Sequence, residues 1–258
     1  MSVIKSFCSA FLMYSRIPAP QVEWTEKNRR FSLCFFPLIG VVIGMLSVMW
    51  FEFCRMFQIG TLLFAVVSAA IPIFVTGGIH IDGFCDVCDA KACFGDRKKM
   101  LDVMSDPHVG AFAVLGLIAY ELIQVGIFSE IKNVRLAAVV SLCYVMSRAW
   151  SGLAAVTFKA AKKQGTLYSF SKPAHKNITV ITELLYIAAA GAIMVYLLPL
   201  GGLFSLLGSV GSFLYYKRFS YKKFGGITGD LAGYFLQICE IISMSFAVIS
   251  EIVSGVII

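Results

Sequence analysis

Charged side chains are scarce in this chain. Asp, Glu, Lys and Arg make up only 14% of its 258 residues, whereas 59% are hydrophobic, and the mean hydropathy is +0.82. Soluble globular domains carry about 25% charged residues, so this scarcity excludes a soluble protein with a solvated surface. We predict an all-α, polytopic integral membrane protein that has the lipid bilayer as its partner.

A cleavable signal peptide, internal repeats and linkers are also missing. The N-terminus carries Lys5 and a short apolar run, residues 7 to 13, without a small-residue cleavage pattern. This run predicts an N-terminal helix that lies at the membrane surface. We expect residues 1–258 to form one transmembrane domain. The eight cysteines lie mostly inside apolar runs, where a thiol behaves as a small hydrophobe, and they indicate no disulfide framework.

The net charge of +7 does not indicate a nucleic-acid partner, because membrane topology explains where the basic residues fall. Alternate loops carry five, four, five and four Lys or Arg, against one, two, none and none in the others. We therefore predict seven spans, with the N-terminus on the cytoplasmic side and the C-terminus on the other. Roughly 20 residues cross a bilayer. The apolar runs long enough to do so are residues 33 to 51, 59 to 78, 110 to 129, 134 to 158, 178 to 198, 200 to 216 and 231 to 258.

Aspartates are few, and six of the seven lie between residues 82 and 106, in a cytoplasmic loop by this topology. If residues 82 to 89 are helical, Asp82, Asp86 and Asp89 stand at i, i+4 and i+7 and share one face. Carboxylates this close repel one another unless a cation joins them. Oxygen ligands suit Mg²⁺, which keeps several waters and also binds substrate phosphates. The segment predicts a magnesium site, with a solvated helix face as the alternative.

The residues before the aspartates allow more than one interpretation. His80 lies two residues before Asp82, so on a continuous helix it points away from the aspartate face. It either closes the preceding span or takes part in catalysis. Gly77 and Gly78 permit close approach of the backbone to a phosphate-bearing ligand. A zinc site built from His80 and the neighbouring cysteines is disfavoured, because soft thiolates would not need interleaved aspartates.

Four more polar residues of this loop are candidates. Asp96 predicts an N-cap. Asp106, which precedes a proline, predicts either the N-cap of the third span or a site residue. Lys91 and Arg97 are placed to meet phosphates or to anchor the loop to anionic lipid.

Arg148 lies inside the predicted fourth span. An intramembrane arginine is costly and marks a binding site or a buried partner. It is therefore a candidate to clamp a diphosphate, or it pairs with a buried carboxylate such as Glu121 or Glu240.

A second polar motif, Gly-Gly-Ile-Thr-Gly-Asp at residues 225 to 230, precedes the last predicted span. Thr228 and Gly229 offer a tight turn and backbone N–H groups at a helix start, which favour an anion. Asp230 is the seventh aspartate and is placed on the same membrane side as the others. We predict that it completes the magnesium site, the alternative being an ordinary turn into a helix.

Together these motifs resemble the cobalamin synthase family, also called adenosylcobinamide-GDP ribazoletransferases. The likeness covers nearly the whole chain, and its specific part is the His-x-Asp-Gly-x-x-Asp-x-x-Asp core at residues 80 to 89 with Thr-Gly-Asp at 228 to 230. The chain departs from the family pattern at Ala90, Gln237 and Pro107-His108. Other matching positions are residues 16 to 20, 36 to 40, 76 to 79, 97, 100, 101, 104, 106, 110, 147, 148, 225, 226, 233 and 240.

The resemblance implies the last step of nucleotide-loop assembly in vitamin B12 biosynthesis. In that step α-ribazole, or its 5′-phosphate, displaces GMP from adenosylcobinamide-GDP and gives adenosylcobalamin or its 5′-phosphate. The resemblance also implies a Mg²⁺-dependent phosphotransferase, a multi-pass location in the cell (inner) membrane with the site facing the cytoplasm, and association with other cobalamin-assembly enzymes.

On this hypothesis, catalysis depends on positioning and charge neutralisation at one or two Mg²⁺. The metal ligands would be Asp82, Asp86, Asp89 and Asp230, and one of these or His80 would accept the proton of the attacking hydroxyl. The substrate-binding residues would be Arg148, Lys91, Arg97, Asp106, Gly77, Gly78, Thr228 and Gly229.

Two other functions deserve comparison. A CDP-alcohol phosphatidyltransferase also places spaced aspartates at a cytoplasmic membrane face, but its Asp-Gly-x-x-Ala-Arg motif and later Gly-x-x-x-Asp-x-x-x-Asp are absent. A cation transporter would place acidic residues at mid-membrane depth in paired repeats, whereas these aspartates gather at one side of the predicted membrane.

Overall fold

The computed structural model describes residues 2–257, and within this range the chain is helical, without a β-strand. The predicted all-α class is confirmed. One β-bridge, between Ala160 and Ile227, ties two loops together. The elements are α1 (Ser2–Tyr14), α2 (Glu26–Arg29), the 3-10 helix η1 (Leu33–Phe35), α3 (Phe36–Met56), α4 (Thr61–Thr76), α5 (Ile79–Ala92), α6 (Arg97–Val103), α7 (Ala111–Ser129), α8 (Val134–Thr157), α9 (Thr166–Ser171), α10 (Lys176–Leu197), α11 (Pro199–Phe224) and α12 (Gly229–Ile257).

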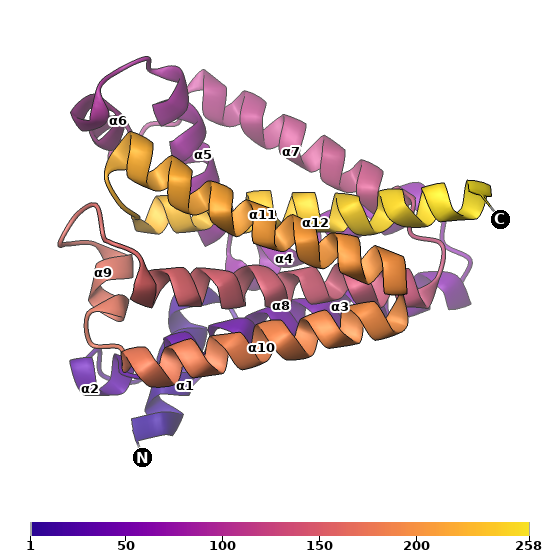
Figure 1. The fold of residues 1–258 in the computed structure, drawn as a ribbon, viewed down its shortest axis with the longest axis horizontal. Coiled ribbons are helices and arrows are strands. Elements are labelled where there is room, and N and C mark those ends of the chain that lie inside the picture. Colours follow the sequence, from indigo (N-terminus) through magenta and orange to yellow (C-terminus); the bar gives the residue numbers. More distant parts are fainter. Residues whose placement is uncertain (1, 258) are drawn as a thin grey trace.

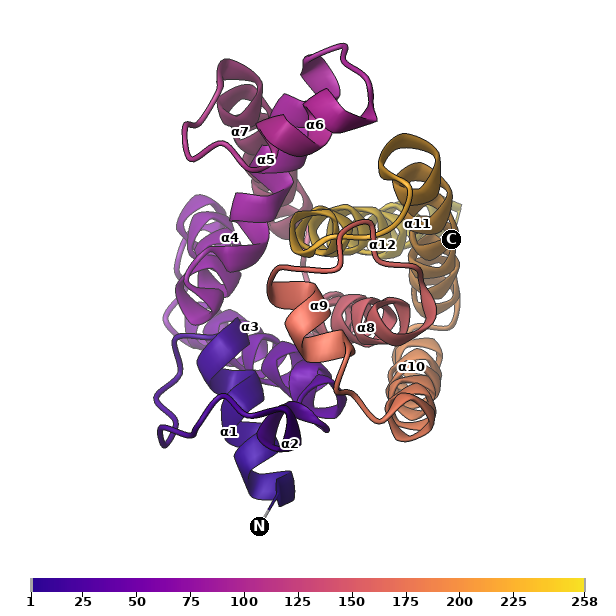
Figure 2. The ribbon, with the colours of Figure 1, turned by 90° about the vertical axis from the view of Figure 1, so that its left-hand side faces the viewer.

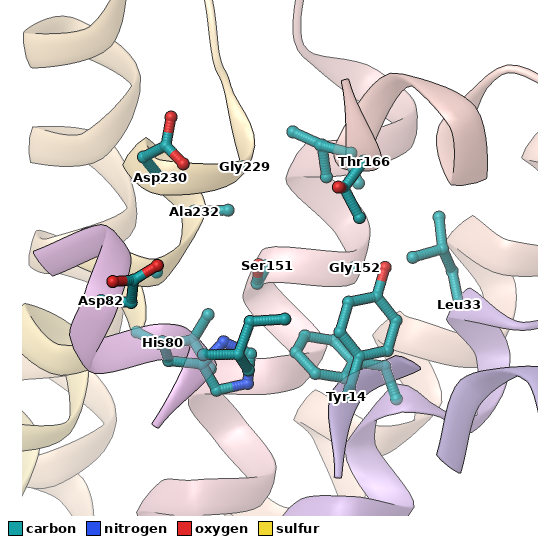
Figure 3. A pocket seen from close by; sticks show the side chains of 16 residues that line it. Tyr14, Leu33, His80, Asp82, Ser151, Gly152, Thr166, Gly229, Asp230 and Ala232 are labelled. Carbon is teal, nitrogen blue, oxygen red and sulfur yellow. The ribbon is translucent and has the colours of Figure 1, made fainter. Parts of the chain in front are cut away.

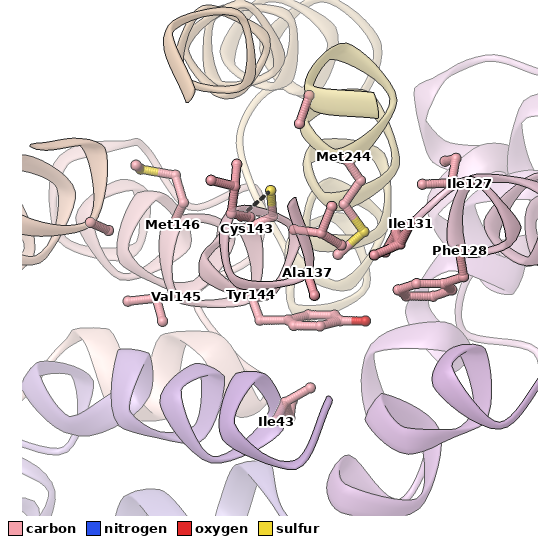
Figure 4. Close-up of a cluster of buried hydrophobic side chains, with 14 of the residues drawn as sticks. Ile43, Ile127, Phe128, Ile131, Ala137, Cys143, Tyr144, Val145, Met146 and Met244 are labelled. Atoms are coloured by element: carbon pink, nitrogen blue, oxygen red, sulfur yellow. Dashed lines mark hydrogen bonds between the residues drawn. The ribbon is translucent and has the colours of Figure 1, made fainter. Parts of the chain in front are cut away.

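The long helices surround α8, which is buried over most of its length (Figure 1). Asn133 starts α8, because its side-chain oxygen accepts a hydrogen bond from the Leu136 amide at 2.9 Å. Helices α3, α10 and α12 pack against α8. Figure 4 shows the apolar core there, with the Tyr144 ring of α8 between Ile43 of α3 and Met244 of α12. This core holds in place the helices that carry the site.

Five helices are long and apolar enough to span a membrane, and the bent pair α4 and α5 makes a sixth candidate if it counts as one span. A polytopic membrane protein is therefore confirmed. The run predicted at residues 200 to 216 forms α11, which packs against α10 and α12. Glycines and serines along its buried face lower its hydropathy, and it is not among the candidate spans of residues 2–257. A total of seven spans stays a prediction.

Helices α4 and α5 meet at an angle of 99°. Gly77 and Gly78 make the turn, with φ angles of 66° and 78° in the left-handed region that glycine adopts without strain. Gly77 also lies against the Arg16 side chain, which leaves no room for a Cβ. After this bend α5 runs across the start of α12. The helix predicted over residues 82 to 89 is present as part of α5.

The loops rich in Lys and Arg gather at one end of the molecule. Helices α2, α6 and α9 and the turn between α11 and α12 lie at this end in Figure 1, and Figure 2 shows the end face on. The C-terminus lies at the opposite end. This arrangement brings the aspartate segment and residues 225 to 230 together, as the loop charges led us to expect.

Candidate active site

The start of α5 lies directly against the start of α12. A Cβ added to Gly83 would lie 2.8 Å from the Asp230 Cα, and one added to Gly233 would lie 2.7 Å from the His80 carbonyl oxygen. Two glycines on facing helices thus allow the two backbones to touch. This close crossing places Asp82 and Asp230, which are 148 positions apart in the chain, on the wall of one cavity.

This helix cavity has a volume of about 200 Å³. Figure 3 shows Asp82 and Asp230 on one side of it and Tyr14 and Leu33 on the other. No lysine or arginine is among the described residues that line it. The lining residues are Tyr14, Leu33, Phe36, Ile79, His80, Asp82, Ser151, Gly152, Ala155, Thr166, Leu167, Gly229, Asp230, Ala232, Gly233 and Leu236.

A second, larger cavity of about 510 Å³ lies among the loops and shares Thr166, Leu167, Gly229 and Asp230 with the first. This loop cavity contains a cation, Lys162, whose Nζ donates a hydrogen bond to Ser105 Oγ at 3.0 Å. Its other described lining residues are Met104, Ser105, Ala160, Gln164, Gly165, Tyr168, Ile227 and Thr228.

The β-bridge fixes the wall between the two cavities. The Ile227 amide donates to the Lys159 carbonyl at 2.8 Å, and the Ala161 amide donates to the Ile227 carbonyl at 2.9 Å. Thr228 then caps α12, because its Oγ1 accepts a hydrogen bond from the Leu231 amide at 3.2 Å. Asp230 therefore sits in the first turn of a helix whose preceding loop is anchored to the loop after α8.

Asp89 binds the start of α7. Its Oδ2 accepts a hydrogen bond from the Gly110 amide at 2.7 Å, and its Oδ1 accepts one from the Ala113 amide at 2.8 Å. These are donors that a helix start leaves unsatisfied. Asp89 therefore has a structural role as a cap supplied from α5, which the sequence did not indicate. Asp86 lies near Asp82, Asp89 and Asp230 but lines neither cavity.

The prediction that Asp106 is the N-cap of the third span is wrong. Helix α7 starts later, at Ala111, and Asp89 occupies its free amides. Asp106 Oδ1 instead accepts a hydrogen bond from the His108 amide at 2.9 Å and lies 2.7 Å from the ring Nδ1 of His108. These contacts lower the pKa of the Asp106 carboxyl. The predicted N-cap at Asp96 is confirmed by a 2.9 Å hydrogen bond from the Lys99 amide to its Oδ1.

His80 is buried whereas Asp82 is exposed, so whether the His80 ring points away from the aspartate face stays a prediction. Both residues line the helix cavity, because the first turn of α5 enters its wall. His80 is 6% exposed, and its Nε2 has no hydrogen-bond partner among the described residues. Its ring packs near Tyr14 and Phe36, with centroids 6.4 Å and 5.7 Å away.

Lys91 and Arg97 lie away from the described walls of both cavities. Lys91 Nζ donates to the Tyr234 hydroxyl at 3.1 Å and stands over the Phe219 and Tyr234 rings. The Arg97 guanidinium packs against Gly225, which has a φ of 80°. Both cations therefore hold the loop end of the molecule together, and their binding of substrate stays a prediction.

The carboxylates of Asp82 and Asp230 fit a Mg²⁺ ion that also binds phosphate. Among the described residues no group of three or more His, Cys, Asp or Glu is placed to hold a metal by itself. Mg²⁺, however, commonly takes only one or two carboxylates and completes its shell with water and substrate phosphate. Asp82 and Asp230 share a cavity without a cation in its described lining, so their negative charge is available to such an ion.

Comparison with known proteins supports the resemblance. Residues 6–248 match the family model described as "Cobalamin-5-phosphate synthase". The chain belongs to this family. Relatives named "Adenosylcobinamide-GDP ribazoletransferase" include one from Lachnoclostridium phytofermentans, 39% identical over 97% of this chain and 96% of the relative. Those from Clostridium botulinum (strain Alaska E43 / Type E3) and Clostridioides difficile (strain 630) are each 28% identical over 94% of this chain and 96% of the relative. No solved structure matches the chain.

Two positions of the cobalamin-5-phosphate synthase resemblance, Arg148 and Glu240, form an ion pair. Arg148 Nη1 lies 2.8 Å from Glu240 Oε1, and each side chain is 1% exposed. Ser147 Oγ donates to the same carboxylate oxygen at 2.7 Å. The sequence left Glu121 and Glu240 open as partners of Arg148, and in the structure the partner is Glu240. Arg148 lines neither cavity, and its contact with substrate stays a prediction.

The sequence missed several residues of this family member's site. In the sequence, Lys162 is one of many loop cations, and Tyr14 directly follows the apolar run of the predicted surface helix. Glu183 is buried with both carboxylate oxygens unpartnered among the described residues, and it packs against Gly152 of the helix cavity. An acidic residue inside an apolar run was the available signal for Glu183. Nothing in the local sequence distinguishes Lys162 or Tyr14.

Proposed function

We propose that this chain catalyses the transfer for which its relatives are named, as the last step in assembling the nucleotide loop of cobalamin. It acts as a cobalamin-5-phosphate synthase: adenosylcobinamide-GDP and α-ribazole, or α-ribazole 5′-phosphate, give adenosylcobalamin or its 5′-phosphate and GMP. The observation that carries this proposal is the pair of adjoining cavities with Asp230 in their shared wall. A reaction that joins two substrates needs two binding regions that meet at the reacting atoms.

The bond changes follow from the products. A ribose hydroxyl oxygen of the acceptor bonds to the phosphorus on the cobinamide side of the diphosphate. The bond from that phosphorus to the bridging oxygen breaks, and GMP leaves with this oxygen. Because a phosphorylated acceptor keeps its 5′-phosphate in the product, the attacking hydroxyl is not the 5′ one. Asp82 or Asp230, the carboxylates in the helix cavity, accepts its proton.

Charge on the diphosphate opposes attack by a hydroxyl. Lys162 in the loop cavity supplies one positive charge, and the Thr228–Gly229 turn presents backbone N–H groups near the start of α12. Mg²⁺ held by Asp82 and Asp230 would neutralise further charge and orient the phosphates. Asp86, close to both, would raise the negative potential that attracts the ion.

The direct test uses the purified full chain in lipid nanodiscs with Mg²⁺, adenosylcobinamide-GDP and α-ribazole. We expect GMP and the joined corrinoid to form in equal amounts. A second reaction with α-ribazole 5′-phosphate determines which acceptor is used. Release of GMP without α-ribazole would indicate a hydrolase, and no product with either acceptor would refute the proposal.

We also propose that the site faces the cytoplasm from the inner membrane, because the basic loops lie at the same end of the molecule as α9 and the start of α12, which line both cavities. A protease-cleavable tag inserted after Ser105 should then be cut in inverted membrane vesicles but not in intact spheroplasts. Cleavage in spheroplasts would indicate the opposite orientation.

Association with enzymes of earlier corrinoid steps is proposed because they share an intermediate. Co-purification after mild solubilisation tests it.

A further inference from the structure

The two cavities differ in charge. The helix cavity has aromatic and apolar walls, with Asp82 and Asp230 at one side and no lysine or arginine among its described lining residues. The loop cavity contains Lys162. The Mg²⁺ proposed at Asp82 and Asp230 would lie at the side where the two cavities meet, so an anionic diphosphate favours the loop cavity with Lys162 and that shared side. The aromatic and apolar part of the helix cavity, away from the two aspartates, favours a neutral, apolar group.

The helix cavity is also small. Its volume of about 200 Å³ is below the range of about 300 to 1,000 Å³ that holds a drug-sized ligand. It has room for one heterocyclic base rather than for a whole nucleotide or a corrin macrocycle. Tyr14, Phe36 and Leu236 provide flat and apolar surface for such a base.

One buried polar group in this wall lacks a partner. His80 is only 6% exposed, yet its Nε2 makes no hydrogen bond with any described residue. Buried polar atoms in native proteins normally have a partner. Because Nε2 is shielded from the cavity, a ligand there supplies this partner once the ring has turned. A half turn of the imidazole about its Cβ–Cγ bond moves each nitrogen to a position that a ring carbon now occupies.

We propose that the helix cavity binds the heterocyclic base of the acceptor nucleoside, and that the His80 imidazole N–H donates a hydrogen bond to the unsubstituted ring nitrogen of that base. This inference rests on the proposed function. It gives His80 a binding role in place of a catalytic one. With the base beside Tyr14 and His80, the attached ribose extends toward Asp82 and Asp230, where the attacking hydroxyl must lose its proton.

The test separates the two substrates. GMP release by the full chain in nanodiscs is measured at varied α-ribazole and fixed adenosylcobinamide-GDP. It is then measured at varied adenosylcobinamide-GDP and fixed α-ribazole. His80→Ala should raise the KM for α-ribazole about tenfold, the effect of one lost hydrogen bond of about 1.4 kcal/mol, and leave the KM for the donor within about twofold. His80→Gln, which keeps an N–H donor, should recover most of the loss.

His175→Asn is the matched control. His175 starts α10, where its Nδ1 accepts a hydrogen bond from the Ile178 amide, and asparagine also caps helices. This variant should leave both KM values unchanged. By contrast, Lys162→Gln should raise the KM for adenosylcobinamide-GDP and not that for α-ribazole.

A measurement on the wild-type protein covers the case in which His80 variants do not fold. Free 5,6-dimethylbenzimidazole should compete with α-ribazole and not with the donor. Two results together would place guanine in the helix cavity and overturn the inference. They are competition of free guanine with the donor and a change in the donor KM alone in His80→Ala. An unchanged KM for α-ribazole in active His80→Ala, or no competition by the free base, would also overturn it.

Failure of the proposed function gives a different result. In that case the wild-type protein releases no GMP from adenosylcobinamide-GDP. Equilibrium dialysis with labelled 5,6-dimethylbenzimidazole then still tests the cavity. Binding that His80→Ala weakens and His175→Asn does not would support the base site, and absence of binding to the wild type would overturn it.

Discussion

The Cα of Asp230 lies so close to Gly83 that a Cβ on Gly83 would stand 2.8 Å from it. Because Asp82 and Asp230 are neighbours of this contact, the spacing of their carboxylates depends on it. The site is therefore as sensitive to the packing of α5 on α12 as to the acidic residues themselves.

Gly83→Ala should lower kcat by about a hundredfold, because small displacements of reacting groups cost rates of this order. The contact is with backbone, which cannot move aside as a flexible side chain would. Gly211→Ala, on α11 with nothing within 4 Å of the added Cβ, is the control and should retain activity. GMP release and melting temperature in nanodiscs are measured for both. Normal kcat in Gly83→Ala would show that the spacing is not critical.

Removal of divalent cations with EDTA should abolish GMP release, and added Mg²⁺ should restore it. Asp82→Asn and Asp230→Asn should each lower kcat by about a hundredfold or more, and the double variant should be little worse if both residues serve one ion. Asp102→Asn, at an exposed position on α6, is the control. Full activity in EDTA would exclude the proposed metal, and additive effects of the two substitutions would assign them to separate steps.

Asp89→Ala should destabilise the protein by about 0.5 to 2 kcal/mol, the usual cost of losing an N-cap. Asp89→Asn keeps one oxygen for the α7 amides and should lose less stability. Thermal unfolding and the Mg²⁺ dependence of GMP release are followed together. A large rise in the Mg²⁺ concentration needed by Asp89→Asn, without a change in stability, would support a metal ligand instead of a cap.

Arg148→Met should destabilise the protein by about 3 to 5 kcal/mol, because it leaves Glu240 buried without its partner. The double variant Arg148→Met/Glu240→Leu removes both charges and should recover most of this stability. GMP release is then assayed in the double variant. Recovery of stability together with activity would refute binding of substrate by Arg148, whereas recovery of stability alone would support it.

The sequence determined those features that depend on neighbouring residues. Hydrophobic runs specified the long helices, the i, i+4, i+7 spacing of Asp82, Asp86 and Asp89 fell within a helix, and Asp96 capped the next one. The bend at Gly77 and Gly78, between α4 and α5, was not predicted. Helix periodicity and capping are local, because their partners lie within four positions in the chain.

Only the tertiary structure decided which of these residues act together. Asp82 faces a cavity with Asp230, whereas Asp89 on the same helix caps α7, because each meets a different neighbouring helix. Lys162 and Tyr14 enter the site from loops and helices far away in the chain. A helix face seen in sequence does not specify its neighbours, since packing of distant segments selects them. The sequence thus indicated the chemistry of the site, and the fold selected the residues that share it.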